Sequence, residues 1–238
     1  MKTLRIPAIL AATILAVSPG RSTAPTVIPP SGGEQFHYSI NWPTGLSLGE
    51  AQLSGSRGQS SGTAEKLTFQ FHLDAAVPGF QVTDTYHSVA SPAYCSAEFD
   101  KTFQHGLKHV DEKETFTSDG NAKRETKGGG STEFETRMCP KDALTYLAYL
   151  RDELSHGRLP QEEVVYYGAP YRLRIEFKDT EQIDLGGKKI DADRLQATIR
   201  GDSAGLAFEM FFLKDTGRTL AMVRVPLAMG TFSMVLDK

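Results

Sequence analysis

The segment Leu67-Thr-Phe-Gln-Phe-His-Leu73 alternates apolar and polar residues without a break. Successive side chains of a β-strand point to opposite faces of a sheet, so this pattern predicts a strand with one buried face and one face in water. The same alternation occurs in Phe36–Trp42 and again in Tyr171–Phe177. Similar stretches follow one another along the chain, separated by turn sequences such as Ser118-Asp-Gly-Asn121.

These stretches predict about fourteen short strands. A sheet with so many strands usually curls into a barrel or bends strongly. The predicted fold is therefore mainly β: an antiparallel, strongly curved sheet, either a barrel or a half-barrel. Residues 80–89 suit either a short helix or an irregular strand. Polar strands are predicted over Ala122–Thr126 and Thr132–Met138, and their charged alternation suits a region of the sheet that is exposed on one side.

One amphipathic helix is predicted between residues 140 and 157. Pro140 suits its first position, because the missing N–H would have no partner there, and Asp142 favours the same end electrostatically. His156-Gly157 ends the helix. The apolar residues recur at helical spacing, at Ala143, Leu144, Leu147, Leu150 and Leu154. We expect this stripe to pack against the sheet.

The composition and the N-terminus indicate the class of protein and its compartment. The chain has 238 residues and a net charge of -3, which gives no electrostatic basis for binding nucleic acid. Lys2 and Arg5 precede the uncharged run Ile6–Val17 and the small residues Ser18-Pro-Gly20, a pattern typical of a secretory signal peptide. The competing interpretation is an N-terminal membrane anchor, but a spanning helix needs about 20 apolar residues.

The predicted organisation is a signal peptide over residues 1–24, a flexible lead-in over 25–33 and a single β-rich domain over 34–238. Export then places the chain in the periplasm. An outer-membrane barrel would need strands of about 9 to 11 residues with a continuous apolar band. The alternating stretches are mostly shorter, so a soluble rather than membrane-spanning protein is predicted. The oligomeric state is left open.

Cys95 and Cys139 are the only cysteines. An oxidising compartment favours a disulfide between them. It would close a loop of about 45 residues, for which the chain-entropy model gives about 4 kcal/mol. Two buried free thiols are the alternative.

Several short motifs contain residue types that occur in catalytic or metal sites. Gly201-Asp-Ser-Ala-Gly205 matches G-x-S-x-G, but a strand rather than a helix is predicted to follow, so no nucleophile elbow is expected. His105 and His109 flank a predicted turn, where an extended chain would separate them by roughly 13 Å, too far for one zinc ion. Asp184, Asp191 and Asp193 suit solvated hairpin positions. No catalytic residue, metal site or cofactor is predicted.

Three longer stretches carry a family resemblance. They are Gly33–Trp42 with Leu48–Leu53, Cys139–Arg151, and Tyr171 onward, including Phe212-Leu-Lys-Asp215 and Gly230–Leu236. Together they resemble the bacterial exported family called domain of unknown function 3108, over about residues 33 to 237. The family often has a Trp near Phe212 and a Pro after the following Arg, whereas this chain reads Arg218-Thr-Leu-Ala-Met222. The resemblance implies a periplasmic location and a β-rich fold, and carries no catalytic residues to transfer.

A curved sheet covered by one apolar helix can hold an apolar or amphipathic molecule on its concave face. We therefore expect a periplasmic ligand-binding or envelope-maintenance protein whose partner is a lipid, another apolar ligand or an envelope protein. The candidate lining residues are the aromatics Trp42, Phe69, Phe71, Tyr146, Phe177 and Phe208. They could instead simply fill the core. The alternative functions are an envelope-polymer hydrolase and an interaction module without a small-molecule site.

Overall fold

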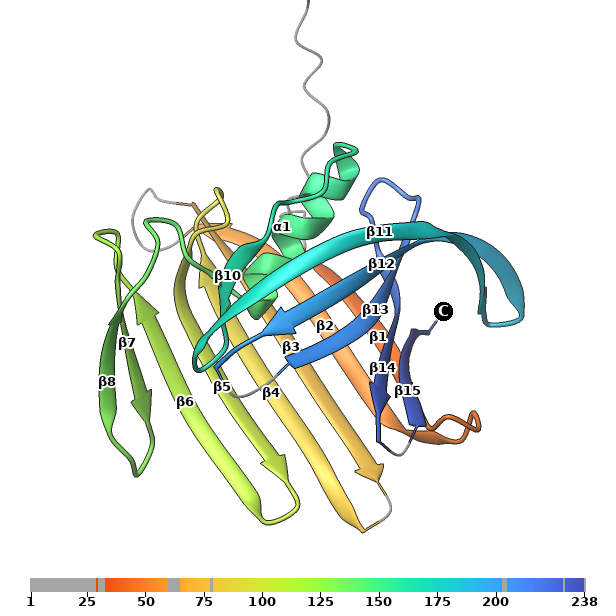
Figure 1. Ribbon diagram of the computed structural model, residues 1–238, viewed down its shortest axis with the longest axis horizontal. Helices are drawn as coiled ribbons and strands as arrows, with labels where there is room; N and C mark the ends of the chain where they lie inside the picture. Colours follow the sequence, from red (N-terminus) through yellow and green to blue (C-terminus); the bar gives the residue numbers. More distant parts are fainter. Residues whose placement is uncertain are drawn as a thin grey trace, which may run out of the picture.

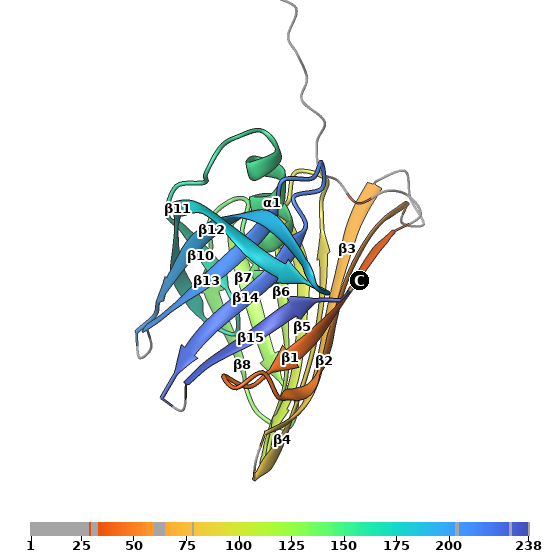
Figure 2. The same ribbon diagram turned by 90° about the vertical axis from the view of Figure 1, so that its right-hand side faces the viewer.

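The computed structural model describes Pro29 and residues 33–59, 65–77, 79–202, 205–228 and 230–237. These residues form fifteen β-strands and one α-helix, with the helix on the concave side of a curved sheet (Figures 1 and 2). The predicted signal peptide lies outside the described residues, as does the predicted lead-in apart from Pro29 and Gly33.

The helix is α1, Ala143–Ser155. The strands are β1 Glu34–Asn41, β2 Ser47–Gln59, β3 Glu65–Val77, β4 Phe80–Ala90, β5 Ser96–His105, β6 Lys108–Phe116, β7 Asn121–Thr126, β8 Ser131–Glu135, β9 Lys141–Asp142, β10 Glu163–Tyr166, β11 Pro170–Leu185, β12 Lys188–Arg200, β13 Gly205–Leu213, β14 Leu220–Leu227 and β15 Gly230–Leu236.

All fifteen strands belong to one sheet, in the order β8-β7-β6-β5-β4-β3-β2-β1-β15-β14-β13-β12-β11-β10-β9. From β1 to β8 and from β10 to β15, strands that follow one another in the chain pair antiparallel, and β1 also pairs antiparallel with β15, which joins the two runs of strands. The short β9 pairs parallel with β10. Within the described residues, the edge strands β8 and β9 do not pair with each other. The predicted mainly β fold is confirmed, and the sheet is not closed into a barrel.

The strands are longer than the alternating stretches predict. β11 has 16 residues, and β2, β3 and β12 have 13 each. The reason is that backbone pairing continues beyond the half-buried part of a strand into polar residues that lack the alternating pattern. At the end of β2, for example, Gln59 pairs with Glu65. The undecided segment 80–89 belongs to the strand β4.

Asp142 begins the helix. Its backbone is extended, and its carboxylate accepts hydrogen bonds from the Leu144 and Thr145 amides at 2.9 and 3.0 Å. It therefore satisfies amides that have no partner within the helix. Placing Pro140 at the first helical position was wrong, because Pro140 precedes the two-residue strand β9. His156 ends the helix as predicted. Among the described residues, no helix has the length and hydropathy to cross a membrane.

The core has three parts. One lies between α1 and β1–β7, and a second lies between α1 and β10–β14. A smaller third cluster includes Ile183, Phe211 and Met222. Phe211 and Phe212 are consecutive on β13 and both fully buried. Since consecutive strand residues point to opposite faces, both faces of the sheet are covered at this point.

The predicted disulfide is confirmed. Cys95 and Cys139 are bonded, with their Cα atoms 4.7 Å apart. The bond ties the connection between β4 and β5 to the segment that leads into β9 and α1. It therefore fixes the start of the helix against the sheet.

Candidate ligand-binding cavity

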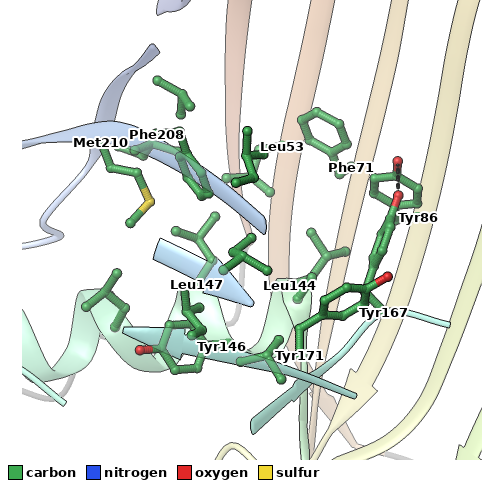
Figure 3. A pocket seen from close by; sticks show the side chains of 18 of the residues that line it. Leu53, Phe71, Tyr86, Leu144, Tyr146, Leu147, Tyr167, Tyr171, Phe208 and Met210 are labelled. Carbon is green, nitrogen blue, oxygen red and sulfur yellow. Dashed lines mark hydrogen bonds between the residues drawn. The ribbon is translucent and has the colours of Figure 1, made fainter. Parts of the chain in front are cut away.

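An apolar cavity of about 480 Å³ lies between α1 and the concave face of the sheet. Five helix residues line one side, and residues from β2, β3, β4 and β10–β15 line the rest. Figure 3 shows Leu144, Tyr146 and Leu147 on the helix and Phe71, Phe208 and Met210 on the sheet. Every lining residue is aliphatic, aromatic or methionine: Leu53, Phe71, Tyr86, Ala143, Leu144, Tyr146, Leu147, Leu150, Val165, Tyr167, Tyr171, Leu173, Ile199, Leu206, Phe208, Met210, Leu220, Val223 and Met234.

A buried polar cluster positions the start of the helix beside the cavity. The Asp142 carboxylate is fully buried and accepts hydrogen bonds from the hydroxyls of Ser88 and Ser96 at 2.6 Å and of Thr145 at 2.8 Å. Burial raises the pKa of Asp142, and these hydrogen bonds oppose the rise. The cluster joins α1 to β4 and β5, so it fixes one wall of the cavity.

A buried ion pair holds the other end of the helix. The Arg151 guanidinium donates to both carboxylate oxygens of Glu34, at 2.5 and 3.0 Å, and its Nε donates to the Gly217 carbonyl at 3.0 Å. Two parallel hydrogen bonds of this kind fix direction as well as distance. α1 is thereby fastened to the start of β1 and to the β13–β14 connection.

The concave face changes from apolar to charged along a single row of paired residues. Phe71 on β3 faces Tyr86 on β4, which faces Lys101 on β5, which faces Glu112 on β6. The Tyr86 and Tyr167 hydroxyls lie 2.5 Å apart where the row leaves the cavity, shown by the dashed line in Figure 3. Burial raises the pKa of both tyrosines. Both hydroxyls are therefore neutral at physiological pH, and one donates to the other.

Beyond this tyrosine pair lies a set of charged residues, which we call the charged region: the buried Lys101 and Glu114 and the partly buried Glu112 and Arg124. Lys101 Nζ lies 2.6 Å from Glu112 Oε2 and 4.4 Å from the centre of the Tyr167 ring. Arg124 donates to the Gly168 carbonyl. Gly168 has a φ of 74°, and a Cβ there would lie 2.7 Å from Glu112 Oε2. Only glycine lets the β10–β11 turn lie this close to the ion pair.

Glu114 is the unusual member of the charged region. It is almost fully buried, and within the described residues neither carboxylate oxygen has a partner at hydrogen-bond geometry. Burial raises the pKa of Glu114 to about 7, while the nearby Gly168 amide and Lys101 oppose this rise. Asp142 and Glu112 add to the rise through their negative charge.

The six predicted lining residues occupy different places. Phe71, Tyr146 and Phe208 line the cavity. Phe69 is buried in the neighbouring core cluster. Trp42 packs edge-to-face on Phe232, with ring centres 4.8 Å apart, and lies outside the cavity lining. Phe177 also lies outside the cavity, with 51% of its surface exposed.

The other motifs do not converge on a site. The exposed His105 and His109 lie on opposite sides of a turn, and His105 Nε2 lies 2.8 Å from Asp84. A strand, β13, begins at Gly205, and Ser203 lies outside the described residues. No histidine lines the cavity. In the described part of the chain, no group of three or more His, Cys, Asp or Glu side chains is placed to hold a metal ion.

Sequence reasoning missed the charged region. The sequence predicts a strand over residues 109–117 and assigns no site to it, whereas the structure buries Glu114 of β6. The available signal was the spacing along the strands. Lys101 lies two residues from both Phe99 and Phe103, and Glu114 lies two residues from Phe116. These charges therefore share the inward face with aromatic residues.

The chain matches one protein family over most of its length. Residues 37–237 match the family described as protein of unknown function, DUF3108. The chain belongs to the DUF3108 family. This confirms the resemblance drawn from the sequence. No curated protein matches the chain.

Among solved structures, a β-barrel-like protein of the domain of unknown function DUF1849 from Brucella abortus is similar to this DUF3108 chain. The TM-score is 0.58 at 9% identity, over 90% of this chain and 97% of that chain. At this identity the likeness concerns the fold alone. A Bacteroides fragilis protein described as exported, with a YmcC-like fold, gives a TM-score of 0.38 at 6% identity, again over 90% and 97% of the two chains. This score is too low to support an argument.

Proposed function

We propose that this chain is an exported envelope protein of the periplasm that binds an apolar or amphipathic molecule in the cavity beneath α1. The observation that carries the proposal is the cavity itself: about 480 Å³ lined only by aliphatic, aromatic and methionine side chains. This volume falls within the range of roughly 300–1,000 Å³ typical of ligand pockets. The N-terminal pattern of residues 1–24 supports export.

The chemistry of the lining favours a hydrocarbon ligand over water. A buried water needs two to four polar partners, and an apolar cavity of about 150 Å³ can stay dry and bind benzene. This cavity is about three times larger, and the hydroxyls of Tyr86 and Tyr167, two of the tyrosines that line it, already pair with each other. An alkyl chain or a small ring system therefore fits the lining better than a sugar or a peptide.

The proposal is tested by filling the cavity. Leu147 on α1 lines it, so Leu147→Trp should occupy much of the volume. Leu159→Trp is the matched control, because Leu159 is exposed and lies outside the cavity lining. With an anilinonaphthalene dye as probe, we expect Leu147→Trp to weaken binding by about tenfold or more, the equivalent of losing about 1.4 kcal/mol. The control should bind as the wild type does.

Native mass spectrometry of the protein recovered from its own envelope provides a second test. An adduct that Leu147→Trp loses and Leu159→Trp keeps would support the proposal. Equal dye binding by the two variants, together with no adduct on the wild type, would contradict it. No buried histidine and no carboxylate lines the cavity, so the geometry does not favour the hydrolase alternative.

A further inference from the structure

Four turns at one end of the sheet each have an exposed leucine in the turn or on the strand directly beside it. These are Leu46 after β1, Leu107 between β5 and β6, Leu206 after the β12–β13 turn, and Leu227 at the end of β14, with exposed fractions of 64, 105, 38 and 49%. Most of the other large exposed hydrophobic side chains, including Met138 and Leu159, lie elsewhere. We call the four leucines and their turns the leucine rim.

The strand pairing places these turns at the same end. The end of β1 faces the start of β15, and the end of β14 faces the start of β13. Val82, near the start of β4, faces His105, the last residue of β5. The β1–β2, β5–β6 and β14–β15 turns lie along the bottom of the view in Figure 1.

We infer that the leucine rim docks on the surface of a lipid bilayer that contains anionic lipid. The four leucines lie at separate turns rather than in one groove, and a planar interface can take several separate anchors at once. Trp42 packs on Phe232 between the tips that carry Leu46 and Leu227. Tryptophan favours the boundary between hydrocarbon and headgroups.

The charges of the rim complement an anionic surface. The turns at this end, together with the strand residues directly beside them, contain three cations, Lys108, Lys127 and Arg200, and one carboxylate, Asp202. Lys127 lies 3.3 Å from Asp111 of β6 but remains mostly exposed. The chain as a whole carries a net charge of -3. Its attraction to negative headgroups would therefore act through this end, at short range and weakened by salt.

The rim is continuous with the cavity. Leu206 belongs to both, being exposed on its turn and part of the cavity lining. Tyr171, the second residue of β11, also lines the cavity, and its ring lies over Gly201 of the β12–β13 turn, where a Cβ would come within 2.7 Å. The cavity therefore reaches the docking end, so an apolar molecule could pass between bilayer and cavity with little exposure to water. Docking itself depends only on the turns and not on the proposed ligand.

The test uses the chain recovered after export and vesicles of phosphatidylethanolamine with phosphatidylglycerol. Trp42 is the only tryptophan, so its fluorescence reports on this end. We expect the wild type to sediment with these vesicles and its emission to shift to shorter wavelength. Binding should be weaker to phosphatidylcholine vesicles and at high salt.

Leu46→Asp/Leu227→Asp should lower vesicle binding at least about tenfold, because two apolar anchors are replaced by charges that the surface repels. The matched control is Met138→Asp/Leu159→Asp. Met138 packs beside Gly120, in the turn between β6 and β7, where a Cβ would lie 3.7 Å from its sulfur, and Leu159 follows α1, so both lie away from the rim. This control should bind as the wild type does. Leu107→Asp serves as a second rim variant if the double variant does not fold.

Failure of docking and failure of ligand binding would look different. If the wild type neither sediments nor shifts its Trp42 emission, or if the control loses as much binding as the rim variant, the docking inference is overturned. Dye binding in the cavity is measured without vesicles. The rim variant should keep that binding, because neither Leu46 nor Leu227 lines the cavity.

Discussion

The concave face of this sheet contains two neighbouring regions of opposite character. Beneath α1, aliphatic and aromatic side chains surround unfilled space of about 480 Å³. On the strands next to Tyr86, an ion pair forms between Lys101 and Glu112. Gly168 lies directly against this ion pair, which is possible only because glycine has no Cβ. The same face is thus loosely filled where it is apolar and tightly filled where it is charged.

This difference bears on function. A cavity loses the dispersion contacts that a filled core would make. A buried ion cluster loses hydration that its mutual attraction only partly replaces. Neither region is what stability alone would favour. The rigid, directional contacts of the charged region fix the wall beside Tyr86 and Tyr167, whereas the apolar region leaves room for a ligand.

Placing a charge in the apolar region should have the largest effect. Met210 lines the cavity and is buried, so Met210→Glu would bury a carboxylate that lacks the cation available to Glu112. We expect a loss of about 5 kcal/mol in the free energy of unfolding near neutral pH. The loss should be smaller at low pH, where the new carboxyl is neutral. Urea unfolding measures it.

Phe177→Glu is the matched control for this prediction. Phe177 is half exposed, so the same new carboxylate stays in water. Its effect should be within about 0.5 kcal/mol. If both variants lost the same stability, the apolar region would not be the dry environment described above.

Removing the cation from the charged region should have the next largest effect. Lys101→Met leaves Glu112 buried without its partner, and should cost about 4 kcal/mol. The double variant Lys101→Met/Glu112→Leu removes both charges and should recover most of that loss. A double-mutant cycle by urea unfolding measures the coupling. Additive effects of the two single changes would argue against a tight ion pair.

The alternation of the sequence predicts most of the fold, because a half-buried strand has to place apolar residues at every second position. Parity also indicates which aromatics point inward. It does not indicate how far along each strand the helix reaches. A helix of 13 residues is about 20 Å long, so it covers only part of the concave face. Phe71 and Phe208 lie within its reach, whereas Phe177 lies beyond it.

The charged region could not be predicted from local pattern, because its burial depends on a distant segment. Glu114 and the Tyr167–Gly168 turn are more than fifty residues apart in sequence, and that turn supplies the cover. Taken alone, the charged residues 109–138 are typical of a solvated strand pair. The docking of β10 and β11 over them is a tertiary contact, and no period in the sequence encodes it.

A third prediction concerns pH. The pKa of Glu114 is about 7 in the folded chain, above its usual value near 4.5. A raised pKa means that the folded state holds the proton more tightly, so this contribution to stability is complete below about pH 4.5 and is lost as the pH rises through 7. Glu114→Gln, which does not titrate, should therefore become more stable than the wild type at high pH. The expected gain at about pH 8 is at most about 3 kcal/mol.

Urea unfolding of both proteins between about pH 4 and pH 8 measures this gain. The two stability curves should converge at the acid end and separate above neutrality. Glu112→Gln is the contrasting variant, because it removes the partner of Lys101 and should destabilise the chain at neutral pH. A Glu114→Gln curve parallel to the wild-type curve would mean that Glu114 titrates normally.

The smallest expected effect lies at the boundary between the regions. The Tyr86 hydroxyl is paired with that of Tyr167, whereas within the described residues the buried Tyr146 hydroxyl has no partner. Tyr86→Phe removes a hydrogen bond and leaves the Tyr167 hydroxyl unpaired, which should cost about 1 kcal/mol. Tyr146→Phe removes a group that is already buried without a bond, and should be neutral or slightly stabilising. Thermal unfolding of the two variants side by side measures the difference. Equal losses would mean that the tyrosine pair adds nothing to the wall that separates the cavity from the charged region.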